Sequence, residues 1–106
     1  MVNARQFDVY RVIGLRAGSA VDLAVVLQDD TLSHTSTRVV APLIPVPRDF
    51  GFDRATPAAD VDGVHYMIAV HLVTTVASRN LGALVASLKN HDRAIKNAID
   101  LVFFGV

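Results

Sequence analysis

The side chains best suited to chemistry in this chain are four histidines, and their spacing does not bring them together. They are His34, His65, His71 and His91. We predict that His65 and His71 share one face of a strand, but they lie too far apart along it to bind one ion. No carboxylate completes a ligand set at metal-binding spacing. We therefore predict no metal site, no cofactor and no catalytic residue here, and expect surface or partly packed histidines.

Two short motifs resemble known sites but lack the residues that would complete them. Asp60-Val61-Asp62-Gly63 matches part of a calcium loop without the later ligands or the closing Glu, so a hairpin turn is the better interpretation. Asp49-Phe50-Gly51 spells a kinase magnesium motif, but no glycine-rich or catalytic loop accompanies it. The charged residues around these motifs are predicted to be solvated loop charges: Arg38, Arg48, Arg54, Asp49 and Asp53.

The most informative stretch is the last one, from residue 88 to residue 106. Its apolar residues recur at the three-and-four spacing of a helix face: Leu88, Ile95, Ala98, Ile99 and Val102. Phe103 falls at the edge of that face, whereas Phe104 falls on the opposite, polar side. Gly105 is predicted to end the helix in the left-handed conformation. Phe104 is thus either an ordinary exposed aromatic at a frayed end or an anchor for another macromolecule.

Length and composition bound the remaining possibilities. With 106 residues the chain is predicted to be a single domain, residues 1–106, with one modest core. Hydrophobic residues make up 52% of it, so part of this surface is expected to be buried in an oligomer interface. Ten basic and ten acidic residues cancel, which argues against direct binding to nucleic-acid backbones. Without cysteine, membrane span or signal peptide, a cytoplasmic protein is expected.

Several strands are predicted to position the C-terminal helix. Residues 6–12 alternate as a half-buried strand, residues 22–28 form a more buried one, and residues 38–45 a third. Pro42 lacks an N–H, so it is expected at a sheet edge or bulge. Asp62-Gly63 predicts a hairpin, followed by a long strand from Val64 to Thr75. Residues 76–87 fit a short strand and turn or an earlier helix start, with Ser87 or Asn90 as the helix N-cap.

A family resemblance enters at the tail. The run from Ile95 to Leu101 and then Phe103-Phe104-Gly105-Val106 resembles the C-terminal signature of the CcdB toxins, Ile-Lys-Asn-Ala-Ile-Asn-Leu-x-Phe-Trp-Gly-Ile. Asp100 replaces the Asn of that signature, Phe104 the Trp and Val106 the Ile. The resemblance continues through nearly the full chain, at Gln6, Phe7, Val9, Tyr10, Gln28, Asp30, Arg38, Val40, Pro42, Leu43, Leu81, Gly82, Val85 and Leu88. It is thin over residues 44–60 and 71–79.

The resemblance implies a mainly antiparallel β fold, an SH3-like barrel of five or so strands with a small extra sheet and one C-terminal α-helix. It implies a homodimeric, non-enzymatic toxin that binds the DNA gyrase A subunit and traps the gyrase–DNA cleavage complex. The gyrase-binding residues would be Phe104, Gly105 and Val106, with Arg93 and Lys89 at positions where the family has Asn and Ser.

The resemblance also implies a cognate CcdA-like antitoxin that neutralises the toxin and represses the shared operon with it. Operator DNA would be contacted only through the antitoxin. The same barrel is shared with the PemK/MazF-like endoribonuclease toxins, which cleave messenger RNA. An endoribonuclease, or a CcdB-like protein that has lost gyrase activity, is therefore the alternative. For residues 76–87, the family resemblance favours a strand followed by a turn over an earlier start of the helix.

Overall fold

The computed structural model describes residues 4–15, 21–32 and 34–106. Its strands are β1 (Asp8–Ile13), β2 (Val21–Val26), β3 (Thr37–Pro45), β4 (Ala58–Val61), β5 (Val64–Ile68), β6 (Thr74–Ala77) and β7 (Leu81–Ser87). Short 3₁₀ turns lie at η1 (Asp30–Leu32), η2 (Val70–Leu72), η3 (Ser78–Asn80) and η4 (Lys89–His91). The chain then forms α1 (Asp92–Phe104), the one α-helix of the described residues. The described part thus has seven strands, more than the five or so that the sequence predicted.

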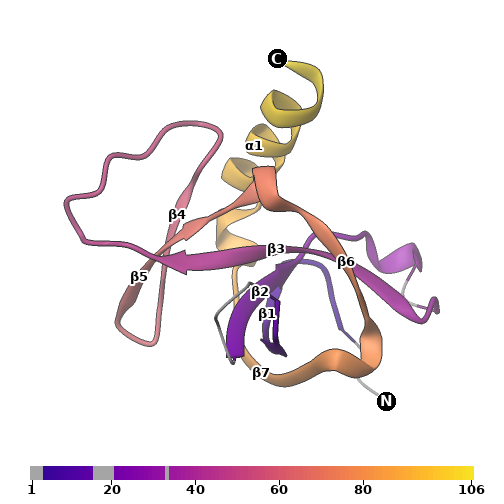
Figure 1. The fold of residues 1–106 in the computed structure, drawn as a ribbon. Coiled ribbons are helices and arrows are strands. Elements are labelled where there is room, and N and C mark those ends of the chain that lie inside the picture. Colours follow the sequence, from indigo (N-terminus) through magenta and orange to yellow (C-terminus); the bar gives the residue numbers. More distant parts are fainter. Residues whose placement is uncertain (1–3, 16–20, 33) are drawn as a thin grey trace.

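The strands form one antiparallel sheet in the order β4-β5-β3-β2-β1-β7, and it curls into a half-barrel (Figure 1). β3 is the longest strand, and it changes partner along its length. Residues 37–40 pair with β6, whereas residues 43–45 pair with β5. The β4–β5 hairpin joins the same sheet at the end of β3, so it extends the main sheet and is not the separate small sheet that was predicted. The predicted mainly antiparallel barrel with one C-terminal helix is therefore confirmed.

Both faces of the central strands are buried, which corrects the prediction of a half-buried first strand. Val9 and Val25 are fully buried on the side that receives α1. Tyr10 and Ala24 are buried on the other side, with Leu81 of β7. Neighbouring residues of a strand point to opposite faces, so this alternation makes two apolar clusters. Burial also raises the pKa of the Tyr10 hydroxyl, with the Asp8 carboxylate adding to the shift.

Pro42 lies in a central strand rather than at the predicted edge. It is buried and pairs with Ala24 of β2. On the opposite side of β3, however, the pairing with β6 stops at Val40 and the pairing with β5 starts at Leu43. Pro42 falls in that gap, where its carbonyl accepts the Ala69 N–H at 2.9 Å. A residue without an N–H is tolerated here because the neighbouring strand is interrupted at this point.

The same interruption divides the strand that was predicted from Val64 to Thr75. The chain pairs as β5 up to Ile68, turns through η2, and resumes as β6 at Thr74. His65 and His71 therefore belong to different elements, and they do not share a strand face as predicted. The apolar run itself contains no Gly or Pro that would mark this break.

Arg38 is not the solvated loop charge that the sequence predicted. Its side chain is buried, and Nη1 donates to the Thr35 and Thr37 carbonyls at 2.6 and 2.8 Å. Nη1 also lies 3.1 Å from the Ser78 hydroxyl, across 40 residues of sequence. A buried guanidinium needs such acceptors, since an uncompensated buried charge is costly. Arg38 thus ties the start of β3 to the η3 turn.

The predicted Asp62-Gly63 hairpin is confirmed. Val61 pairs with Val64, and Asp62 and Gly63 have φ values of 51° and 77°. Positive φ at both central positions is the type I′ geometry that matches the twist of the strands, and it favours this dipeptide. Across the hairpin, the Asp60 carboxylate accepts hydrogen bonds from His65 Nδ1 at 2.5 Å and Arg48 Nη1 at 3.0 Å.

We expect the Asp60 contacts to make the hairpin sensitive to acid. The hydrogen bonds from His65 and then Arg48 hold the pKa of Asp60 below its ordinary value of 3.8. A lowered carboxyl pKa contributes stability above the unfolded-state pKa, and this contribution is lost as pH falls through the folded-state value. Thermal unfolding of wild type and Asp60→Asn should therefore differ at pH 7, and the difference should shrink as the pH falls below the ordinary carboxyl pKa of 3.8. A difference that stays the same below that pH would contradict this account.

Candidate functional site

The C-terminal helix is fixed to the barrel by one apolar face, as its sequence predicted. Ile95 and Ala98 are fully buried, and Ile99 and Val102 pack more shallowly against the same cluster. Helix α1 begins later than expected, at Asp92, because residues 89–91 form the η4 turn. The N-cap is His91, without a side-chain capping bond, and not the predicted Ser87 or Asn90. The Ser87 hydroxyl instead accepts the Lys89 N–H at 3.3 Å.

The last turn of α1 projects beyond the body of the protein (Figure 1). Phe104 is 74% exposed and Val106 73% exposed, so neither side chain contributes to the core. Gly105 has a φ of 74°, and its N–H donates to the Leu101 carbonyl at 3.0 Å. This left-handed glycine cap closes the helix immediately after Phe104. The helix therefore presents Phe104 from a hydrogen-bonded turn, and the three tail residues form a compact apolar tip.

The tip has one further contact that the sequence did not reveal. Arg54, in the loop between β3 and β4, donates from Nη2 to the Val106 carbonyl at 3.1 Å. This bond joins residues 52 positions apart, so no local spacing could have predicted it. It places a guanidinium beside the end of the chain, where cations complement the negative pole of a helix.

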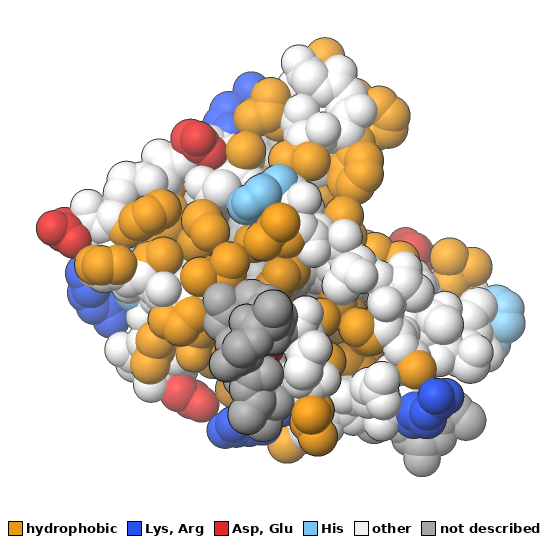
Figure 2. Space-filling view, in the orientation of Figure 1, with side chains coloured by type: hydrophobic (Ala, Val, Ile, Leu, Met, Phe, Trp, Pro, Cys, Tyr) orange, Lys and Arg blue, Asp and Glu red, His pale blue; other side chains and the backbone are white. Residues whose placement is uncertain are grey.

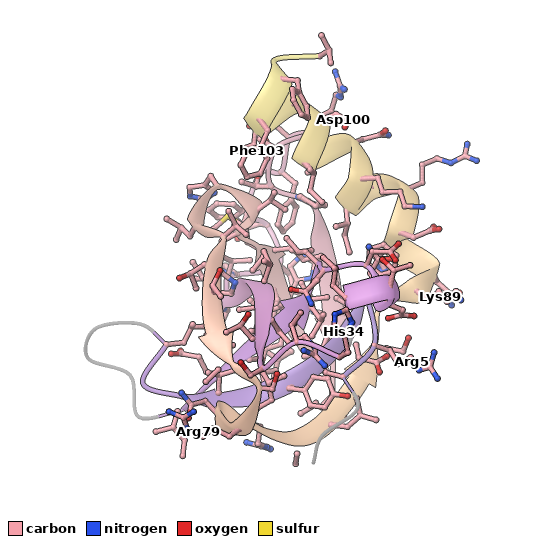
Figure 3. The ribbon with its side chains drawn as sticks, turned by 90° about the vertical axis from the view of Figure 1, so that its right-hand side faces the viewer. Arg5, His34, Arg79, Lys89, Asp100 and Phe103 are labelled. Atoms are coloured by element: carbon pink, nitrogen blue, oxygen red, sulfur yellow. The ribbon has the colours of Figure 1, made fainter. Side chains whose placement is uncertain are left out.

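Lys89 and Arg93 lie at the opposite end of the helical region, far from the tip. Figure 3 shows Lys89 near the base of the helix, with Asp100 and Phe103 towards its other end. Arg93 and Phe104 fall on nearly the same side of α1 at ~100° per residue, but their backbones are separated by ~16 Å of helix rise. Arg93, Asn97, Asp100 and Phe104 are all exposed. The five residues predicted to bind gyrase therefore do not form one cluster: three make the tip, and two lie at the base.

An apolar groove runs beside the tip, on the side of Phe103. Its cavity of about 320 Å³ is lined by Leu27, Gln28, Asp29, Leu32, Val39, Val73, Ile99 and Phe103. Phe103 is 56% exposed, and Leu32 of η1 is about half exposed across the groove. Figure 2 shows the projecting end of the molecule separated by a notch from the lobe beside it. Sequence periodicity placed Phe103 at the edge of the apolar stripe. It could not show the groove, to which η1 and β3 contribute Leu32 and Val39.

Phe50 of the Asp49-Phe50-Gly51 motif and His65 belong to a group of packed aromatic rings. The ring of Phe50 meets that of Phe52 edge to face at 5.3 Å, and Phe52 meets His65 at 5.1 Å. Within the described ranges, no group of three or more His, Cys, Asp and Glu residues is placed to hold a metal ion. Over the same ranges, no helix has the length and apolar character needed to cross a membrane.

Comparisons with solved structures identify the fold. An endoribonuclease in complex with its cognate antitoxin, from a mycobacterial species, superposes with a TM-score of 0.74 at 16% identity, over 92% of each chain. An endoribonuclease from a mycobacterial species gives 0.76 at 15% identity, over 96% of this chain and 92% of the other. The Mycobacterium tuberculosis toxin MazF-mt6 gives 0.73 at 15% identity, over 91% and 95%. At these identities the likeness establishes the barrel fold only.

Comparisons of sequence identify the family. A search of curated proteins gives no match. The model of the family described as CcdB protein, however, matches residues 6–105, nearly the whole chain. That range includes the barrel, the apolar face of α1, Phe104 and Gly105. The chain therefore belongs to the CcdB family, which supplies toxin components of toxin–antitoxin pairs.

Proposed function

We propose that this toxin acts by binding the A subunit of DNA gyrase through its C-terminal tip, holding gyrase on cleaved DNA and catalysing no reaction itself. The observation that carries the proposal is the exposed Phe104 at the end of a capped helix. Aromatic anchors that lie apart from the core are typical of binding hot spots. The tip stands away from the barrel, so it can enter a recess of a partner.

Phe104 is suited to stack on an arginine of gyrase. A guanidinium over an aromatic face gains about 0.5–2 kcal/mol, depending on how far the pair is desolvated. Asp100 lies one helical turn before Phe104 on an exposed position. Its carboxylate can therefore pair with the same guanidinium. Arg93 and Lys89, at the base of the helix, would then meet a more distant and preferably acidic part of the target.

We further propose that the toxin is a homodimer that presents two such tips, which adds avidity through one rigid body. The apolar groove beside Phe103 supports this, because its lining and the half-exposed Leu32 and Leu72 offer apolar surface that a second copy could cover. A CcdA-like antitoxin would bind the dimer and remove it from gyrase in the cytoplasm. The neutral charge of the chain supports operator contact through the antitoxin and not through the toxin.

An endoribonuclease is the second candidate, because solved structures with this fold carry that description. A nuclease needs an acid, a base and a phosphate clamp close together. Among the described residues, Asp60, His65 and Arg48 come nearest to such a set. However, Arg48 is already held by the Asp60 carboxylate and the Gly63 carbonyl. A third candidate, loss of gyrase activity, follows from Phe104, since Trp is the stronger cation–π partner.

The two activities are separated by one pair of assays on the purified protein. Incubation with gyrase and supercoiled plasmid is expected to accumulate protein-linked, double-strand-cleaved DNA, whereas plasmid without gyrase stays intact. The same preparation is expected to leave messenger RNA uncut. Cleaved RNA would instead establish the endoribonuclease, and His65→Gln should then abolish the cleavage. Intact DNA and intact RNA together would favour a family member without gyrase activity.

A further inference from the structure

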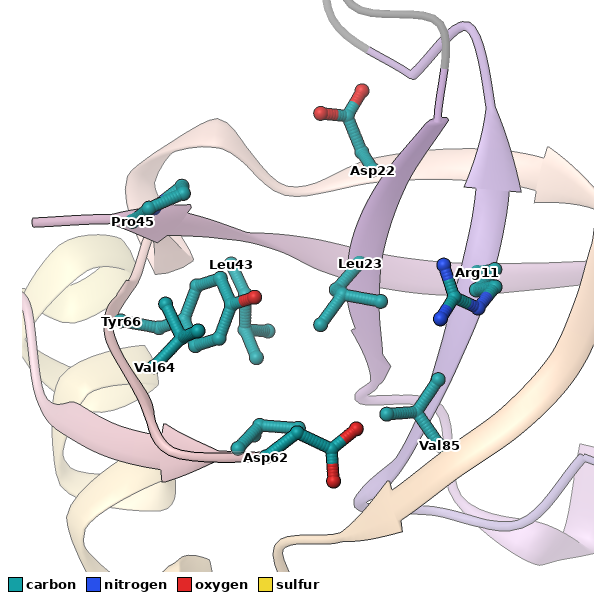
Figure 4. Close-up of a pocket in the computed structure, with 10 residues that line it drawn as sticks. Arg11, Asp22, Leu23, Leu43, Pro45, Asp62, Val64, Tyr66 and Val85 are labelled. Atoms are coloured by element: carbon teal, nitrogen blue, oxygen red, sulfur yellow. The ribbon is translucent and has the colours of Figure 1, made fainter.

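A second pocket lies on the barrel, and the proposed function makes no use of it. It has a volume of about 280 Å³ and lies between the sheet and the β4–β5 hairpin (Figure 4). Its apolar lining includes Leu43, which is buried, together with Leu23 and Val85. A pocket slightly below the ~300–1,000 Å³ of drug-sized sites is suited to a small ring system.

Three polar side chains from different elements face this space. Figure 4 shows the Arg11 guanidinium on one side, the Asp62 carboxylate on another and the Tyr66 hydroxyl towards the middle. In the part of the chain that the structure describes, these side chains form no hydrogen bond or ion pair with one another or with other residues. Asp22 also lines the pocket, but its carboxylate points away from the centre in Figure 4 and has another interaction. The pocket therefore combines an unused donor group, an unused acceptor group and apolar walls.

The two charges that face the centre of the pocket, those of Arg11 and Asp62, cancel. The centre is therefore matched to a ligand with an acceptor edge and a donor edge instead of a net charge. Arginine pairs in a bidentate manner with the O6 and N7 acceptors of guanine. The adjacent edge of the same base carries the N1–H and N2–H₂ donors, which a carboxylate can accept with both oxygens. Adenine keeps the N7 acceptor but replaces O6 with an amino donor, so one of the two arginine hydrogen bonds is lost. Its unprotonated N1 and its C2–H offer the carboxylate no donor, so that contact would be unfavourable.

From this complementarity we propose that the pocket binds a guanine base, with Arg11 on its O6/N7 edge and Asp62 on its N1/N2 edge. The apolar side chains pack against the faces of the ring, and the Tyr66 hydroxyl bonds to a polar group at its margin. The base can come from a free nucleotide or from a single-stranded nucleic acid, since both present the same edges. The pocket lies on the barrel and the tip on the projecting helix, so this site is independent of gyrase binding.

The backbone at Asp62 allows a sharp test. Asp62 has a φ of 51° in a type I′ turn, where Asn is the most favoured residue before glycine. Asp62→Asn therefore keeps the hairpin while it replaces one carboxylate oxygen with a donor. IMP differs from GMP only in lacking the 2-amino group, from which the Asp62 carboxylate is proposed to accept a hydrogen bond. The pair of ligands and the pair of proteins form a cycle that isolates this single contact.

Binding of GMP, IMP and AMP is measured by heteronuclear NMR titration of the full-length protein. The wild type is expected to bind GMP on the order of tenfold or more tightly than IMP, as for a hydrogen bond to a charged group, and to bind AMP least. Asp62→Asn should reduce the GMP-to-IMP ratio to near one. Arg11→Met should weaken the binding of both GMP and IMP, whereas the control Arg5→Met, at an exposed position, should weaken the binding of neither. Shifts should be confined to the pocket residues around Arg11, Leu23 and Tyr66.

Equal binding of GMP and IMP by the wild type, an unchanged ratio in Asp62→Asn, or no pocket shifts at millimolar GMP would each overturn the proposal. A further titration separates the two sources of guanine. Tighter binding of a guanine-containing tetranucleotide than of GMP, weakening with added salt, assigns the site to single-stranded nucleic acid. No gain over GMP assigns it to a free nucleotide. A variant without residues 104–106 should give the same titrations, which separates this test from that of the tip.

Discussion

Deleting Phe104, Gly105 and Val106 is expected to abolish growth arrest and leave the protein folded. Phe104 and Val106 are about three-quarters exposed, and none of the three residues belongs to the buried face of α1. Exposed end residues contribute little to stability, so we expect a loss of about 1 kcal/mol or less. The loss of the Arg54 bond to the Val106 carbonyl falls within that amount, because surface pairs are weak. Function should be lost because the projecting aromatic is the proposed hot spot.

The experiment compares full-length and truncated proteins in a bacterium with sensitive gyrase. Growth, gyrase-linked DNA breaks and messenger RNA are monitored, and sedimentation of the purified proteins checks whether both form the proposed dimer. Two single substitutions refine the comparison. Phe104→Ala should weaken gyrase binding by on the order of tenfold or more, and Phe104→Trp should strengthen it. Killing by the truncated protein, or RNA cleavage by the full-length one, would refute the tip mechanism.

Local pattern carried enough information to predict much of the fold. Alternation located the first strand, and the apolar segments at residues 22–28 and 38–45 located the next two. Asp62-Gly63 located the hairpin, and the three-and-four spacing identified the buried face of α1. What it missed depends on partners that are distant in sequence. The break between β5 and β6 accommodates Pro42 of β3, and the burial of Arg38 depends on Ser78. The exact N-cap was also missed, because η4 displaces the start of α1 to Asp92.

The candidate site divides in the same way. The exposure of Phe104 followed from helical phase alone, since a residue opposite the buried stripe must face away from the barrel. The groove beside Phe103 and the Arg54 contact could not be predicted, because each joins α1 to segments far along the chain. Arg93 and Lys89 were included through the family resemblance, and the ~16 Å of helix rise from Arg93 to Phe104 separates the base from the tip. Their contribution to gyrase binding stays a prediction.

Replacing Ile95 with alanine is expected to cause the largest loss of stability among the substitutions considered, about 3 kcal/mol within the ~2–5 kcal/mol range for such core changes. Ile95 is fully buried between α1 and the barrel, in contact with the cluster that includes Val9, Leu43 and Ile68. Truncation removes its buried methyl and methylene groups and leaves a cavity in a close-packed region. The higher helix propensity of alanine offsets only about 0.5 kcal/mol of this loss.

The matched control is the same substitution at Ile13, which is 79% exposed at the end of β1. Ile13→Ala should change the free energy of unfolding by about 0.5 kcal/mol or less. Urea unfolding of the three proteins measures both changes. One fixed protein concentration is used, because the proposed dimerisation would make the apparent stability depend on concentration. Equal losses at the two positions would show that the helix is not anchored through Ile95. If the two losses differ as expected, Ile95→Ala should lower toxicity by reducing the amount of folded protein. The folded fraction of Ile95→Ala should still bind gyrase, whereas Phe104→Ala should stay folded and lose gyrase binding. The two variants therefore separate the residue that anchors the helix from the tip that binds the target.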